Sequence, residues 1–118
     1  MPHAVIEFSA NLTEVVQATK ATAAVHQAMI ASGLFAVPAD IKTRAYAAQD
    51  FLVGELGQQQ GSFVHVTISL LEGRTIAQKQ ALTDLVRNAL QQLLPTVEQL
   101  SVDIRDMTKD TYRKAVRG

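Results

Sequence analysis

The chain has 118 residues, with 11 Lys plus Arg against 11 Asp plus Glu and no cysteine. This length predicts one domain over residues 1–118, and a net charge of zero provides no overall field that would attract nucleic acid or an anionic membrane. The absence of cysteine excludes disulfides and thiolate chemistry, and without a secretory leader or an apolar run of ~20 residues we expect a soluble cytoplasmic protein.

Taken in order, the first third of the chain predicts a strand and then a helix. Residues 3–9 alternate between the two faces of a strand, with apolar side chains on one face. Asn11 and Glu14 have the spacing of a capping box, in which an Asn side chain satisfies free amide groups at a helix start. The apolar residues that follow predict a helix that ends at Ser32-Gly33.

A second strand is predicted over residues 41–47, after a connector over 34–40. Its alternation places the cations Lys42 and Arg44 on the same face. Residues 51–61 contain three glycines and a run of three glutamines, so we interpret them as a loop that joins two halves of the chain.

The second half repeats this plan. Residues 64–70 form the clearest strand pattern, and Thr75 with Gln78 then makes a Thr-x-x-Gln capping box. An amphipathic apolar stripe predicts a helix from Ile76 to Leu93, which Pro95 stops.

A fourth strand follows over residues 100–105, and the polar tail over 107–118 is left open between a short helix, an arm onto a neighbour and disorder. The order strand, helix, strand, twice, predicts an α+β fold with pseudo-repeats over about 2–50 and 62–107. Parallel crossovers in each unit give a four-stranded mixed sheet with two helices on one face. Half-apolar residues then line the other face, which suggests contact with further copies of the chain: His3, Val5, Tyr46, Phe63, His65 and Thr67.

Pro2 is the first candidate for chemistry. Methionine is normally trimmed before a small residue, so the mature chain is expected to begin with the secondary amine of Pro2. Partial burial lowers the pKa of such an amine from its usual value near ~8, which suits a base for proton transfer. The alternative is that proline simply starts the strand, where it costs no ladder hydrogen bond.

Two motifs together resemble a known family. The chain opens Pro2-His-Ala-Val-Ile-Glu-Phe-Ser9, and its second half carries a strand, a Glu72-Gly-Arg74 turn and a helix. This combination resembles the 5-carboxymethyl-2-hydroxymuconate isomerase family, whose members are double-length tautomerases with an N-terminal proline, over nearly the whole chain to about Met107. The resemblance implies a tautomerase-like fold, a homotrimer and a cofactor-independent isomerase of aromatic-acid catabolism. It also implies that Pro2 is the acid/base that moves a proton along a dienol diacid.

The resemblance further implies a catalytic role for Arg74 and substrate binding by Lys42 and Arg44. Arg74 matches the arginine of the family turn, and a guanidinium can hold a carboxylate through two parallel hydrogen bonds. Lys42 departs from the family pattern, which has an arginine there, because lysine offers charge without a planar fork. Arg44 on the same face could compensate. Without the resemblance, Arg74 is a surface arginine in a tight turn, and the other two cations belong to a solvated strand face.

No metal site is predicted, because His3, His26 and His65 lack ligand spacing. We interpret His3 and His65 as packing or hydrogen-bonding residues, and Glu7 and Glu72 as structural partners. Two alternatives to the diacid isomerase remain: another Pro2-dependent enol tautomerase, and a non-catalytic ferredoxin-like ligand-binding module. Removal of Met1 favours an enzyme, since an acylated proline nitrogen is not a base.

Overall fold

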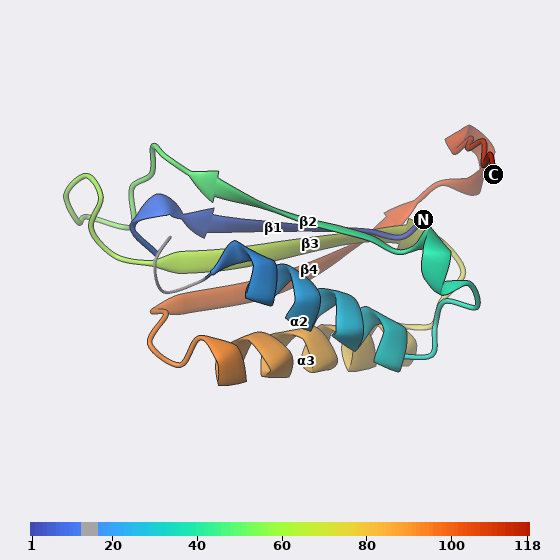
Figure 1. Ribbon diagram of the computed structural model, residues 1–118, viewed down its shortest axis with the longest axis horizontal. Coiled ribbons are helices and arrows are strands. Elements are labelled where there is room, and N and C mark those ends of the chain that lie inside the picture. Colours follow the sequence, from blue (N-terminus) through green and yellow to red (C-terminus); the bar gives the residue numbers. More distant parts are fainter. Residues whose placement is uncertain (13–16) are drawn as a thin grey trace.

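The computed structural model describes residues 1–12 and 17–118, and these residues form a four-stranded mixed sheet with two α-helices against one face (Figure 1). The strands are β1 (His3–Ser9), β2 (Lys42–Ala48), β3 (Phe63–Leu71) and β4 (Gln99–Met107). The helices are α2 (Ala18–Ala31) and α3 (Ile76–Leu93), with short 3-10 helices η1 (Ala10–Leu12), η2 (Pro38–Asp40) and η3 (Lys109–Thr111). The predicted α+β fold is confirmed.

The sheet has the order β2-β1-β3-β4. β1 pairs with β2 in parallel, β3 pairs with β4 in parallel, and the two central strands β1 and β3 are antiparallel. One hydrogen bond recurs at the start of each parallel pair. The amide of Lys42 donates to the carbonyl of Pro2 at 3.1 Å, and the amide of Gln99 donates to the carbonyl of Ser62 at 3.2 Å.

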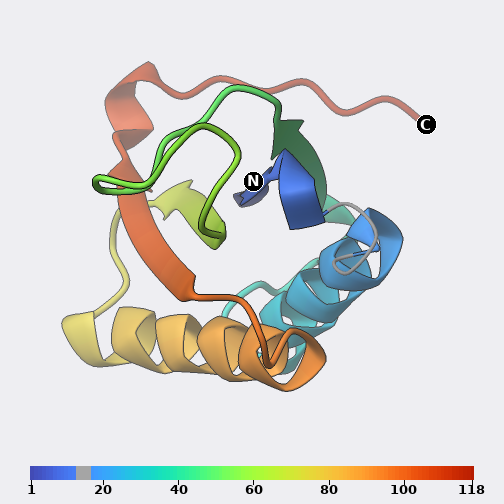
Figure 2. The same ribbon diagram turned by 90° about the vertical axis from the view of Figure 1, so that its left-hand side faces the viewer.

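The core lies between the helices and the near face of the sheet (Figure 2). Alternate residues of the central strands are fully buried there because side chains alternate between the faces of a strand. On β1 and β3 they are Ala4, Ile6, Phe8, Val64, Val66, Ile68 and Leu70, and the helices add Ala21, Val25, Met29, Leu82, Val86 and Leu90. The strand residues that alternate with them point to the far face of the sheet, and most of these are partly buried.

Asn11, whose predicted capping box with Glu14 stays a prediction, contacts the loop before β3. Asn11 lies in η1, and its side-chain amide donates to the carbonyls of Gln59 at 3.3 Å and Gly61 at 2.7 Å. Glu14, the other half of the predicted box, lies outside the described residues. α2 is preceded by Gln17, which gives it no side-chain cap. Asn11 therefore ties β1 to the loop before β3.

The other differences concern strand ends. β2 runs one residue later than predicted, and β4 is longer at both ends than residues 100–105. β4 is extended because every residue of β3 has a partner on it, from Phe63 opposite Gln99 to Leu71 opposite Met107. The tail forms η3 and continues without regular structure to Gly118.

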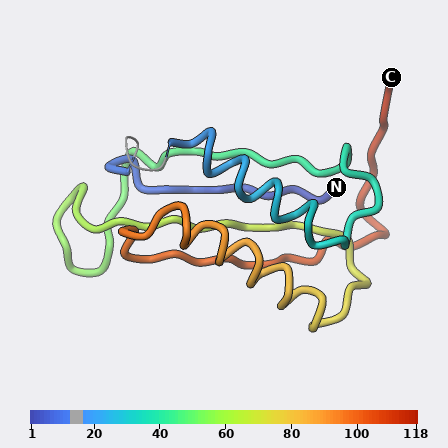
Figure 3. Tube along the Cα trace, turned by 60° about the horizontal axis from the view of Figure 1, so that its bottom comes forward, coloured from blue at the N-terminus to red at the C-terminus, as the bar shows by residue number. Residues whose placement is uncertain are grey.

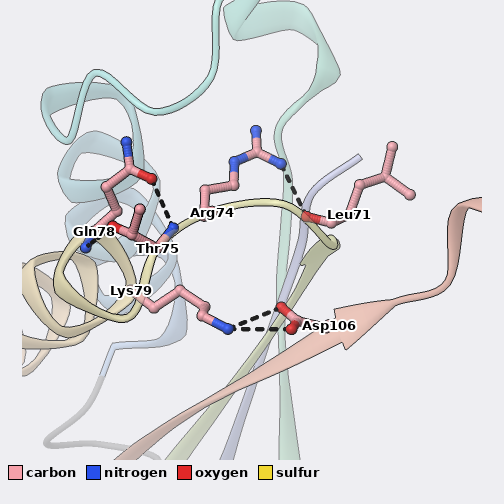
Figure 4. A network of polar contacts seen from close by, with 6 residues as sticks. All are labelled: Leu71, Arg74, Thr75, Gln78, Lys79 and Asp106. Carbon is pink, nitrogen blue, oxygen red and sulfur yellow. Dashed lines mark hydrogen bonds and ion pairs between the residues drawn. The ribbon is translucent and has the colours of Figure 1, made fainter.

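The predicted capping box at the start of α3 is confirmed. The Thr75 hydroxyl accepts from the Gln78 amide at 3.1 Å, and the Gln78 side-chain oxygen accepts from the Thr75 amide at 2.9 Å (Figure 4). Thr75→Ala should therefore lower the free energy of unfolding by about 1 kcal/mol, measured by urea denaturation at fixed protein concentration. Thr96→Ala, at an exposed turn after α3, is the control. Equal losses in both variants would contradict a specific cap.

Candidate active site

Pro2 lies directly before β1, at the end of the sheet where both chain termini are found (Figure 3). Its ring is less than 2% exposed. Its burial fits the alternation of β1, in which Ala4, Ile6 and Phe8 point to the helix-covered face. The Lys42 amide also holds the Pro2 carbonyl, so the backbone before β1 is fixed against β2.

The amine that precedes Pro2 is in an unusual environment. The Met1 amine donates to the Asp40 carbonyl at 2.8 Å. Its pKa is lowered from 8.0 to about 5, first by burial, then by a hydrogen bond and charge from Lys42 and by the charge of Lys114, while Asp40 opposes the shift. An amine in this environment is neutral at pH 7 and can accept a proton.

Lys42 and Arg44 lie on β2 and point to the far face of the sheet, as predicted. The Lys42 ammonium donates to the Asp40 carbonyl, and the Arg44 guanidinium donates to Nδ1 of His3 at 3.2 Å. Burial lowers the pKa of His3, and the charges of Arg44, Lys42 and the N-terminus lower it further. His3 is thus kept neutral, with Nδ1 free to accept from Arg44.

Arg74 holds the turn after β3. Its guanidinium donates to the carbonyl of Leu71 at 3.1 Å (Figure 4). It also donates to the carbonyl of Leu34 at 3.1 Å and lies 5.2 Å from the centre of the Phe35 ring. Gly73 has φ +120°, a backbone conformation that favours glycine and sets the turn. Two of the five N–H donors of Arg74 are used in these bonds, which leaves three for a ligand.

The β1–β3 register shows which end of the sheet Arg74 occupies. His3 lies opposite Ser69 in the antiparallel pair, so the residues before His3 lie opposite the end of β3. The Leu71 carbonyl that Arg74 binds is at that end. The sequence-predicted residues Pro2, Lys42 and Arg74 thus lie at the same end of the sheet, and Arg44 lies one pair further along β2.

A groove of about 760 Å³ lies between α2 and the edge strand β2. Lys42 and Arg44 line it together with His26, whose Nδ1 is 2.8 Å from the Thr43 hydroxyl. Pro2 and Arg74 are not part of its lining. The groove is thus bordered by the β2 residues that carry the two predicted substrate-binding cations, but their side chains point to the far face of the sheet, where Arg44 contacts His3.

Two residues of this region were missed by the sequence analysis. Asp40 accepts from the Met1 amine and from Lys42 through its carbonyl, and its carboxylate pairs with Lys114 at 3.1 Å. Lys114 is part of a tail with three other cations, and no local pattern singles it out.

The histidines have hydrogen-bonding partners of their own. Besides the contacts of His3 and His26, Nδ1 of His65 is 2.6 Å from the Ser101 hydroxyl. Among residues 1–12 and 17–118, no three His, Cys, Asp or Glu side chains form a group that could hold a metal ion. In the same part of the chain, no helix is both long and apolar enough to cross a membrane.

One comparison with known proteins identifies a family. A protein-family model described as 5-carboxymethyl-2-hydroxymuconate isomerase matches residues 2–116. A search of curated proteins gave no match.

Solved structures share the fold at low sequence identity. A crystal structure of a 5-carboxymethyl-2-hydroxymuconate delta-isomerase has a TM-score of 0.81 at 18% identity, covering 100% of this chain and 89% of that chain. The 5-carboxymethyl-2-hydroxymuconate isomerase from Deinococcus radiodurans R1 has a TM-score of 0.86 at 19% identity, covering 98% and 90%. A fused 4-OT described as a symmetric trimer has a TM-score of 0.75 at 24% identity, covering 96% and 91%.

Proposed function

Because the chain belongs to the 5-carboxymethyl-2-hydroxymuconate isomerase family, it is an isomerase of the tautomerase type, and we propose that Pro2 is its acid/base. The substrate we propose is a dienol dicarboxylate, 5-carboxymethyl-2-hydroxymuconate, formed in aromatic-acid catabolism. The reaction moves one proton from one position of the conjugated system to another. No atom is gained or lost, so the proposed reaction uses no cofactor.

One observation carries this proposal: the first amine of the chain is partly buried, and this burial and the neighbouring cations lower its pKa to about 5. When Met1 is removed, the secondary amine of Pro2 becomes the terminal base and lies at the same end of the sheet. Burial and the neighbouring cations then favour its neutral form. A neutral amine held in a ring can take a proton from the dienol and return it to carbon.

The cations are proposed to hold the anionic parts of the substrate. Lys42 and Arg44 reach the far face of β2, and Arg74 keeps three N–H donors beyond those used for the Leu71 and Leu34 carbonyls. Positive charge fixed before the reaction stabilises the carboxylates and the oxyanion that develops as the proton leaves.

A homotrimer in the cytoplasm is proposed as the working form. The similarity to a fused 4-OT described as a symmetric trimer supports the assembly. The half-apolar far face supports it as well, because Val5, Phe63 and His65 lie there with intermediate burial in the single chain.

The test joins a mass measurement to an assay. Intact mass first establishes whether Met1 is absent from the purified protein. Ultraviolet absorbance then follows 2-hydroxymuconate and its carboxymethyl analogue, and we expect rapid loss of both dienols with the chain that begins at Pro2. An equal rate from a chain that keeps Met1 would contradict the proposal, because an acylated proline nitrogen cannot act as the base.

A second candidate, a Pro2-dependent tautomerase of another enol, is favoured by Lys42. A lysine at this position lacks the planar fork that grips a carboxylate through two bonds. Faster turnover of an enol with one carboxylate, such as phenylenolpyruvate, than of both muconates would identify this candidate.

A further inference from the structure

The C-terminal tail crosses the end of the sheet at which Pro2 lies. It leaves β4, one edge strand, and Lys114 pairs with Asp40 immediately before β2, the other edge strand (Figures 1 and 2). A segment that joins the two edges at this end passes the end of β3 and the start of β1. The tail therefore lies over the region of the first amine.

The Glu72-Gly-Arg74 turn fixes the start of this crossing. The Glu72 carboxylate accepts from the Lys109 amide at 2.7 Å, and the Glu72 amide donates to the Met107 carbonyl at 3.0 Å. Glu72 is thus a structural partner, and its partner is the tail. These bonds hold the start of the tail at Met107 and Lys109, and the Lys114–Asp40 pair at 3.1 Å holds its later part beside β2.

Asp40 joins the tail to the candidate active site. Its carbonyl binds the Met1 amine, and its carboxylate binds Lys114. The Lys114 hydrogen bond is the first cause of the lowered pKa of Asp40, so the carboxylate is ionised at neutral pH. Lys114 also lowers the pKa of the Met1 amine, which places its charge within reach of that amine.

We propose that Lys114 is a further substrate-binding residue, which leaves Asp40 and takes a carboxylate of a dianionic ligand bound beside Pro2. This inference rests on the proposed function of the Pro2 site. In the free protein Lys114 is paired with the Asp40 carboxylate, so the ligand carboxylate would take the place of Asp40. Lys42 binds a carboxylate less well than an arginine at that position would. Lys114 would supply part of the missing contact.

The two partners of the Lys114–Asp40 pair should give opposite effects on binding. Lys114→Ala removes the ligand contact and should weaken adipate, an unreactive dicarboxylate, by about tenfold in calorimetric titration of the mature chain. Asp40→Asn removes the competing carboxylate and should strengthen adipate binding. If the pair only braces the tail, both variants break it and both weaken binding.

Controls separate a specific contact from general charge. Lys114→Arg should bind adipate as the parent does, and Arg117→Ala, at an exposed position of the same tail, should leave affinity unchanged. Hexanoate, with one carboxylate, should bind each variant within about threefold of the parent, because it lacks the second charge.

Three results would contradict the proposed role of Lys114. It is overturned if the parent binds adipate no better than hexanoate, if Lys114→Ala binds adipate normally, or if Asp40→Asn and Lys114→Ala weaken it alike. Dienol turnover by the same preparations is the separate test of the proposed function. The expected adipate pattern without dienol turnover would uphold the role of Lys114 and refute the proposed dienol reaction. Dienol turnover without the adipate pattern would uphold that reaction and refute the role of Lys114.

Discussion

Replacing Pro2 with alanine should lower kcat/KM for a dienol dicarboxylate at least about 100-fold, the usual effect of losing a general acid/base. Alanine also permits removal of Met1, so the variant keeps a terminal amine. That amine rotates freely and is not held by a ring. We expect the variant to fold, because the core between the sheet and the helices is unchanged. Ultraviolet absorbance of the dienol measures the rate, and circular dichroism verifies folding.

If Pro2 is the base, the activity of the parent protein should rise with pH. The environment lowers the amine pKa, as it does for Met1, which reaches about 5. A base acts when deprotonated, so kcat/KM should rise as pH increases through the lowered pKa and level off before the ordinary value of about 8. Full activity of Pro2→Ala, or a parent profile that rises only above pH 8, would remove Pro2 from the mechanism.

Arg74→Ala should reduce both stability and activity. It removes two charged hydrogen bonds to the Leu71 and Leu34 carbonyls and the contact with the Phe35 ring, which together stabilise the fold by about 2 kcal/mol. The melting temperature should fall by about 8 °C. At a temperature where the variant is folded, KM for a diacid should rise at least about tenfold, because a carboxylate contact is lost.

Arg74→Lys separates the two roles. Lysine keeps the charge for a carboxylate but cannot bridge two carbonyls, so KM should recover in part while the melting temperature stays low. Arg87→Ala is the control, since Arg87 makes an exposed pair with Asp84 at 3.4 Å that contributes little. If Arg74→Ala loses stability alone, the residue is structural and the substrate role is wrong.

The sequence predicted the elements whose signals are local. The alternation of β3 and the apolar stripe of α3 each follow from the face that the element buries. The reciprocal bonds of Thr75 and Gln78 are complete within one helical turn. Parallel pairing within each strand-helix-strand unit also followed, because such crossovers have one strongly preferred form.

Features decided by distant partners were not predictable in this way. The local pattern at Asn11 predicts a helix start and gives no sign that its side-chain amide also binds carbonyls 48 and 50 residues away. Lys114 lies in a polar tail without periodicity, and its position depends on a carboxylate 74 residues earlier. The sequence motif around Arg74 indicated an anion contact, whereas its bond to the Leu34 carbonyl, 40 residues earlier, depends on how the connector after α2 returns to the sheet.

The hydrogen bond that recurs at the start of each parallel pair has a consequence for stoichiometry. It makes Ser62 the counterpart of Pro2, and Gln99 the counterpart of Lys42. Ser62 is an internal residue with an amide nitrogen, and Gln99 is neutral, so the second unit repeats the backbone frame without the amine or the charge. A trimer of this chain would contain six such frames and three reactive amines, so that each subunit contributes one centre.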